Sequence, residues 1–254
     1  MIIEIRITLC LTSIYSLTMN FRNNDGYKCY KDLKDFKSSF SVFNLNYYEL
    51  RKNSQRQEYL NLLDFPSIKR WRFQKILIKN IFNTITSSLA YLEHVKQKVK
   101  GNTRLRNLIK DDIEICCFFR SLRNYLVHKN TFTLISIQST KGTSTGSVYH
   151  SFDTEMFAEY LKSRETNFDD IALNFLVNLP KRVNFFELLE GLKVWVNSVH
   201  KTLIIEFVKI HYQCLHTLIN RVDRTFEQHN FFYPINNVQV RYINILLKIA
   251  KPSN

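Results

Sequence analysis

Glycine and proline are scarce in this chain, and their scarcity limits its possible folds more than any other feature. The 254 residues contain only 5 glycines and 4 prolines. A sandwich of many short strands, a collagen or an array of short-strand repeats would need many more turn-forming residues. Apolar residues make up 45% of the chain, with 20 phenylalanines and 13 tyrosines, which is ample for a core. A disordered chain would have far fewer apolar residues.

Apolar residues recur at spacings of three and four, which is the pattern of one face of an α-helix. Leu33, Phe36 and Phe40 follow this spacing in the first such stretch. Further on, the segment Asp64-Phe65-Pro66 is a typical helix start and Gly101 a typical helix stop. The predicted helices cover residues of about 32–63, 64–100, 103–128, 153–163, 167–178, 184–228 and 238–249. The long helix predicted for residues 184–228 has at most one break.

One segment departs from the helical pattern. Residues 131–138 are rich in β-branched side chains, residues 139–147 contain two glycines, and residues 148–152 are short and aromatic. This order indicates a strand, a turn and a second strand. The glycines favour a plain hairpin loop over a phosphate-binding loop, because a phosphate-binding loop ends in Gly-Lys-Ser/Thr and leads into a helix, whereas here Lys141 precedes the first glycine and a strand follows. The sequence therefore predicts a mainly α-helical bundle with one β-hairpin inserted at about residues 131–152.

The length of the chain suits a single domain, which we assign to residues 28–254. Residues 1–27 are interpreted as an N-terminal extension, either a strand or a start site placed too early. Residues 7–19 are apolar, but a secretory signal would have a more basic start and a small-residue cleavage site. No apolar run approaches the ~18 residues of a membrane span, so we expect no stable membrane insertion.

The cysteines indicate a reducing compartment. Their number, five, is odd, and no Cys-x-x-Cys spacing occurs. We therefore expect reduced thiols and a cytoplasmic protein. His211, Cys214 and His216 lie close in sequence, but one helix cannot present all three to a single ion and no second ligand pair is evident. The sequence predicts neither a metal site nor another cofactor.

The charge of the chain points to a polyanionic partner. Lysine and arginine number 36 against 22 acidic residues, which gives a formal net charge of +14. A chain this basic binds either nucleic acid or an anionic membrane surface.

The most informative stretch is residues 115–128, at the end of the third predicted helix. Successive helical residues advance by about 100°, which gathers six side chains into an apolar arc of about 120°. Arg120, Asn124 and His128 recur every fourth residue and form a stripe on the opposite side, with Arg123 beside it. The predicted core arc consists of Ile115, Phe118, Phe119, Leu122, Tyr125 and Leu126.

These polar side chains suit chemistry on a phosphodiester. Imidazole transfers protons near neutral pH, and guanidinium binds phosphate oxygens and stabilises the extra charge of the transition state. RNA carries its own nucleophile, the 2′-hydroxyl, so cleavage needs no metal. The simpler interpretation places His128 as a cation at the negative end of a helix. The same Arg-x4-His spacing recurs at Arg224 and His229, so at least one copy has no catalytic role.

The segment Leu122-Arg-Asn-Tyr-Leu-Val-His128 resembles the signature of HEPN-domain proteins, in which arginine and a polar residue precede a histidine. The surrounding sequence from about residue 28 is similar to bacterial HEPN-like proteins of the ribonuclease and toxin type. The resemblance implies a helical bundle that forms a homodimer around one RNA-cleaving cleft. It implies catalytic roles for Arg123 and His128 and a supporting role for Asn124. Some members of such families are inactive binding modules.

A second basic stretch, residues 69–75, interleaves cations with aromatic rings. Lys69, Arg70 and Arg72 are candidate substrate-binding residues, because this composition is typical of surfaces that bind phosphates and stack bases. The alternative is an amphipathic helix that buries Trp71 or Phe73 and leaves the charges in water.

We therefore expect a metal-independent endoribonuclease with an Arg-x4-His site and a toxin or phage-defence role, for which an antitoxin partner is conceivable. In that reading Arg120 joins Lys69, Arg70 and Arg72 in binding RNA. One alternative is an inactive helical protein that binds RNA or a partner. The other is a membrane-surface protein that uses residues 7–19.

An acidic cluster of Asp111, Asp112 and Glu114 is interpreted as a solvated face that pairs with nearby cations.

Overall fold

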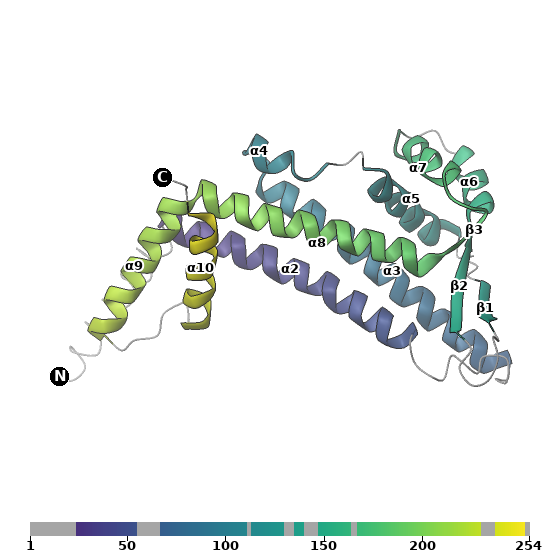
Figure 1. Cartoon of the computed structure of the whole chain (residues 1–254), viewed down its shortest axis with the longest axis horizontal. Helices are drawn as coiled ribbons and strands as arrows, with labels where there is room; N and C mark the ends of the chain where they lie inside the picture. Colours follow the sequence, from purple (N-terminus) through teal and green to yellow (C-terminus); the bar gives the residue numbers. More distant parts are fainter. Residues whose placement is uncertain are drawn as a thin grey trace, which may run out of the picture. The chain divides into compact units, whose positions relative to one another are not determined.

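The computed structural model describes residues 24–54, 67–110, 113–129, 135–139, 147–163, 167–229 and 237–251. Helices dominate these residues, and the predicted mainly α-helical fold with a β-hairpin is confirmed (Figure 1). The helices are α2 (Asp25–Ser54), α3 (Ser67–Lys98), α4 (Thr103–Arg106), α5 (Glu114–Lys129), α6 (Thr154–Lys162), α7 (Asn167–Val177), α8 (Phe185–Ile210), α9 (Tyr212–His229) and α10 (Asn237–Ala250). The strands are β1 (Ile135–Ser139), β2 (Ser147–Asp153) and β3 (Arg182–Asn184).

The described residues fall into two compact units. The first comprises the chain up to Lys37 together with the chain from Lys201, and the second comprises Ser38–His200. Helices α2 and α8 contribute residues to both units. The candidate site, the sheet and helices α3 to α7 all belong to the second unit. The single domain predicted for residues 28–254 stays a prediction.

The predicted hairpin is present and gains a third strand. Strands β1 and β2 pair antiparallel, with Ile135 opposite Ser151 and Ser139 opposite Ser147. Strand β3 then pairs antiparallel with β2 and gives the order β1-β2-β3. Strand β3 was not predicted from the sequence, because three residues between Pro180 and a helix start are too few to show an alternating pattern.

The single helix predicted for residues 103–128 is wrong, because two helices occupy this range. Asn102 caps α4 by accepting a hydrogen bond from the Leu105 amide at 3.0 Å, and the short helix ends at Asn107. Helix α5 then begins at Glu114. Glu114 therefore lies in the first turn of a helix, where a negative charge is favourable, and not in the middle of one.

The first helix begins earlier than the apolar spacing indicates. Helix α2 starts at Asp25, after Asn24 accepts a hydrogen bond from the Gly26 amide at 2.8 Å. A capping side chain of this kind satisfies an amide that lacks a helical partner. The predicted end of this helix, near residue 63, lies outside the described residues, as do residues 1–23.

The predicted starts of two later helices are confirmed by their caps. Asp153 accepts hydrogen bonds from the amides of Glu155 and Met156 at the start of α6. Asn184 accepts one from the Phe186 amide at 3.1 Å at the start of α8, and its own amide donates to Glu187 at 3.2 Å. The long helix that follows has its one break at His211, between α8 and α9.

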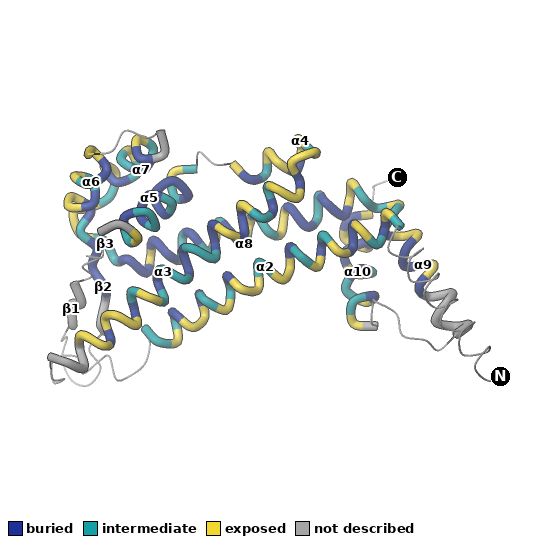
Figure 2. Tube along the Cα trace, turned by 180° about the vertical axis from the view of Figure 1, so that it is seen from behind, coloured by how far each residue is buried: buried dark blue, intermediate teal, exposed yellow. Residues whose placement is uncertain are grey.

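The cores are largely aromatic. In the first unit, Phe36 of α2 meets Phe207 of α8 edge-on, with ring centroids 5.3 Å apart. In the second unit, Phe118 of α5 lies at the centre of several other rings. Figure 2 shows buried and exposed residues alternating along α3 and α8, which is the pattern of helices that cover a core with one side.

Among the described residues, no helix is long and apolar enough to cross a membrane.

Candidate functional site

Helix α5 carries the candidate site and is anchored by aromatic packing. The Phe118 side chain is fully buried, and its ring centroid lies 4.9 Å from that of Phe119, 6.0 Å from Phe152 and 5.7 Å from Phe157. These partners come from α5 itself, from β2 and from α6. Contacts with two other elements of the second unit, β2 and α6, therefore fix the orientation of α5.

A second anchor lies inside the signature segment. Tyr125 is buried, and its ring lies 4.6 Å from Tyr160 and 5.5 Å from Phe157, both of α6. Leu122, which opens the segment, is fully buried. Buried residues on both sides of Arg123 and Asn124 thus determine which way these two polar side chains leave the helix.

The core contacts of α5 extend further around the helix than the predicted arc. Phe118, Phe119, Leu122 and Tyr125 are buried as expected, but Ile115 and Leu126 are only half-buried. Cys116, Cys117 and Ser121 are also buried, outside that arc. The reason is that α5 packs against α3 and against α7, so more than one side of it meets protein.

The predicted polar stripe consequently lies at the border of the core, and its assignment to the side opposite the core is wrong. Arg120, Arg123 and Asn124 are each half-buried. Arg123 donates a hydrogen bond through Nη2 to Oδ1 of Asn124 at 3.2 Å. His128 lies in the last turn of α5, one turn beyond Asn124, and its side chain is outside the described residues.

A carboxylate that the sequence analysis did not consider lies against α5. Asp169, in the first turn of α7, is buried and accepts a hydrogen bond from the Ser121 hydroxyl at 2.6 Å. The two residues are 48 positions apart, so no local spacing could have paired them. The sequence contains one local sign of this residue: Asp169 and Asp170 lie at the start of the helix predicted for residues 167–178, where acidic side chains are favourable.

The second basic stretch forms the beginning of α3. Phe73 is buried and Trp71 is 55% exposed, so the aromatic residue that enters the core is Phe73. The Nζ atom of Lys75 lies over the Trp71 ring, 3.7 Å from the ring centroid, which is a cation–π contact. Arg72 is exposed, and the side chains of Lys69 and Arg70 lie outside the described residues. Among the described residues, no hydrogen bond or ion pair joins Arg72 to α5.

The other patterns contribute no site to the described residues. No group of three or more metal-ligating side chains gathers within the described ranges. Asp111, Asp112, the loop at 140–146 and the side chains of Arg224 and His229 lie outside the description. Cys29, Cys116, Cys117 and Cys214 carry free thiols.

Comparisons of the chain with protein-family models, with curated proteins and with solved structures found no match.

Proposed function

We propose that this protein is an endoribonuclease that cleaves RNA without a metal ion, through Arg123 and His128 of α5. The observation that carries the proposal is the hydrogen-bonded pair of Arg123 and Asn124, half-buried one turn before His128. A guanidinium held in place at the border of a core loses less freedom when it binds a phosphate than one on a free surface. The resemblance of residues 122–128 to the HEPN signature supports the same assignment.

The proposed reaction is an internal transesterification. A base takes the proton of the 2′-hydroxyl, the 2′-oxygen bonds to phosphorus, and the bond from phosphorus to the 5′-oxygen breaks. A proton then returns to the leaving 5′-oxygen, so the products carry a 2′,3′-cyclic phosphate and a 5′-hydroxyl. His128 supplies proton transfer, and Arg123 stabilises the charge that builds up on the phosphate oxygens.

Asn124 has a supporting role in this scheme. Its Oδ1 accepts a hydrogen bond from Arg123, which holds the guanidinium in one direction. Its amide nitrogen is then available to a ribose hydroxyl or to the imidazole of His128. Arg120 lies one turn earlier on the same stripe and is proposed to bind the RNA backbone.

RNA affinity is proposed to come mainly from the excess of cations. The formal charge of +14 favours a polyanion whatever its sequence. At the start of α3, the exposed ring of Trp71, with Lys75 over it and Arg72 beside it, offers stacking and phosphate contacts together. Lys69 and Arg70 extend the same basic segment.

The wider biological proposal rests on the resemblance. In that proposal two copies of the chain form a homodimer around a shared cleft, and the enzyme acts in the cytoplasm as a toxin or in phage defence, where an antitoxin partner would restrain it.

Cleavage of a labelled RNA pool by the purified full-length chain in EDTA tests the proposal. We expect His128→Ala and Arg123→Ala to lower the cleavage rate by about 10²–10⁴-fold and to keep most of the RNA affinity. His229→Ala, at the second Arg-x4-His spacing, is the matched control and should cleave like the wild type. Equal cleavage by wild type and His128→Ala would contradict the proposal. Binding without any cleavage would instead identify a non-catalytic RNA-binding protein.

A further inference from the structure

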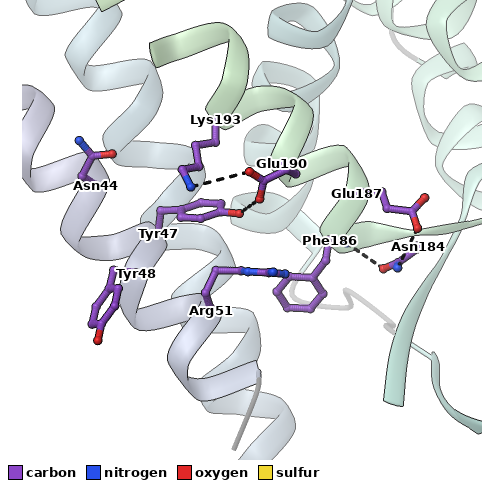
Figure 3. Close-up of a pocket in the computed structure, with 9 residues that line it drawn as sticks. All are labelled: Asn44, Tyr47, Tyr48, Arg51, Asn184, Phe186, Glu187, Glu190 and Lys193. Atoms are coloured by element: carbon purple, nitrogen blue, oxygen red, sulfur yellow. Dashed lines mark hydrogen bonds and ion pairs between the residues drawn. The ribbon is translucent and has the colours of Figure 1, made fainter. Parts of the chain in front are cut away.

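Helices α2 and α8 contact each other within each of the two units. In the second unit, the Tyr47 hydroxyl of α2 donates a hydrogen bond to the Glu190 carboxylate of α8 (Figure 3). In the first unit, Phe36 of α2 meets Phe207 of α8 edge-on, with ring centroids 5.3 Å apart. The contact of Phe36 with Phe207 fixes the register of α2 against α8 in the first unit.

The helices of the first unit pair in opposite directions. Asp32 lies four residues before Phe36, and His211 lies four residues after Phe207. Burial lowers the pKa of His211, and the negative charge of Asp32 opposes this change, so these two side chains lie near each other. A step back along α2 therefore matches a step forward along α8, which makes the two helices antiparallel.

The same register continues into α9. The His211 amide donates a hydrogen bond to the Phe207 carbonyl at 3.1 Å, and the Leu215 amide donates one to the His211 carbonyl at 3.0 Å. Helical spacing is therefore kept across the break between α8 and α9. Farther back on α2, a Cβ atom added at Gly26 would overlap with the backbone oxygen of Cys214. The backbones of α2 and α9 thus come into close contact at this point.

Two cysteines face each other in this register. Cys29 lies seven residues before Phe36, and Cys214 lies seven residues after Phe207. Seven residues make about two helical turns, which return a side chain to the same face of its helix. Because Phe36 and Phe207 are in contact and the helices are antiparallel, Cys29 and Cys214 lie opposite each other. Cys214 is also close enough to Cys29 to influence the pKa of its thiol.

The two free thiols differ in exposure. Cys29 is buried, whereas Cys214 is half-buried. Burial, together with nearby Cys214, Asp32 and Asp25, raises the pKa of Cys29 to about 11. The thiolate is the reactive form of cysteine, so Cys29 alone reacts slowly with a reagent in solution. Cys214 is the thiol of the pair that such a reagent reaches first.

We propose that Cys29 and Cys214 form a reversible disulfide that joins α2 to α9 when a small-molecule disulfide oxidises the protein. A disulfide requires Cα atoms within about 4.4–6.8 Å of each other. Two helices allow such a bond only where their backbones approach closely, as they do at Gly26, one turn before Cys29. Disulfides that form transiently in a reducing compartment are typical of redox sensing. Both cysteines belong to the first unit, and none of the residues proposed to cleave RNA takes part in the bond.

The link forms in two exchange steps. Cys214 loses its proton and attacks one sulfur of the small disulfide, whose sulfur–sulfur bond breaks and releases one thiolate. Cys29 then loses its proton to solvent and attacks the Cys214 sulfur, which releases the second thiolate. The two protein thiols have then lost two electrons and two protons, and the small disulfide has been reduced to two thiols. The second step occurs within one molecule, so the position of Cys29 opposite Cys214 offsets its high pKa.

Peptide mass spectrometry of the full chain tests the proposal. The reduced protein is incubated with oxidised glutathione without denaturant, the remaining thiols are alkylated at low pH, and the chain is digested. We expect a linked peptide pair that contains Cys29 and Cys214 and that dithiothreitol separates. Cys214→Ser should lose the linked pair completely. Cys29→Ser should stop after the first step, with glutathione attached to Cys214.

Cys10→Ser is the control and should form the linked pair like the parent chain. Cys214 is only half-buried, so Cys214→Ser keeps the core of the first unit even if Cys29→Ser fails to fold. Absence of the linked pair in the native chain would overturn the proposal. A pair that forms only after unfolding in urea, or that joins Cys10 to either cysteine instead, would also overturn it, because the bond would then not reflect the packing of α2 on α9.

Discussion

At the scale of single residues, two histidines are held neutral inside the second unit. Burial lowers the pKa of His150 to about 4 and that of His200 to about 4. His150 lies between the rings of Phe73 and Phe186. The His200 ring stacks on Phe40 at 3.7 Å, and its Nδ1 is 2.7 Å from the Tyr91 hydroxyl. These surroundings favour the uncharged imidazole, because a cation would lose its hydration there.

The protein should therefore lose stability in mild acid. An unfolded histidine has a pKa near ~6.5, so between about pH 6.5 and pH 4 the unfolded chain binds protons that the folded chain does not. The neutral histidines therefore contribute to the free energy of unfolding above about pH 6.5, and this contribution is lost as the pH falls toward 4. Each histidine accounts for about 1–3 kcal/mol of the free energy of unfolding. Urea unfolding at a series of pH values measures it. His200→Gln and His150→Gln should each give a shallower pH dependence; an unchanged slope in both would contradict the assignment.

Single residues also show what the sequence could and could not reveal about the site. The helical wheel predicted that Arg123 and Asn124 leave α5 side by side, and they do, because neighbouring positions on one helix are set by local geometry. The contact of Ser121 with Asp169 and that of Tyr47 with Glu190 span 48 and 143 positions. Contacts of this kind depend on how separate helices pack against each other, and the spacing of residues within one helix gives no information about that packing.

At the scale of elements, the first unit depends on a close approach of α2 to α9. A Cβ atom added at Gly26 would lie 2.3 Å from the backbone oxygen of Cys214 and 2.9 Å from Cβ of Leu218. Real side chains do not approach this closely, and backbone cannot rotate away as a side chain can. Only glycine therefore fits at position 26, because any larger residue would clash with α9.

Gly26→Ala should destabilise the protein by about 1–3 kcal/mol, because α2 and α9 must move apart to accept the methyl group. Gly101→Ala is the matched control. An added Cβ there meets no atom within 4 Å, so its effect should stay within about 1 kcal/mol, toward stabilisation. Thermal unfolding of both variants measures the difference. Equal midpoints for the two variants would show that the two helices are not in close contact.

Element boundaries followed from the sequence where a cap marks them. Asp153 and Asn184 cap the starts of α6 and α8 at the predicted positions. Each accepts a hydrogen bond from a backbone amide two residues later, and such a local contact can be recognised from the sequence. The break between α4 and α5 was missed, because the apolar spacing continues through residues 103–128 while Asn102 and Asn107 confine α4 to one turn. Strand β3 was missed because its pairing with β2 is its only signal.

At the scale of the whole molecule, the excess of 36 basic over 22 acidic residues should determine how the proposed RNA binding responds to salt. Each phosphate that the protein neutralises releases condensed counterions, so affinity should fall steeply as salt rises. Contacts to about four phosphates of a single strand would lower the affinity roughly fiftyfold between about 50 and 200 mM salt. Anisotropy titrations of the His128→Ala protein at several salt concentrations give the slope. A flat response would mean that the charge serves another purpose.

In the proposed function, α5 cleaves RNA with the 2′-hydroxyl of the substrate as nucleophile and without a metal. The most direct measurement compares an all-ribose strand with a strand of the same sequence that carries 2′-deoxyribose, both incubated with the wild-type chain in EDTA. We predict that only the ribose strand is cut, that its products end in a 2′,3′-cyclic phosphate and a 5′-hydroxyl, and that His128→Ala cuts neither. Cleavage of the deoxyribose strand, or cleavage that needs a divalent metal, would contradict the claim and would direct attention to the acidic residues Asp111, Asp112 and Glu114.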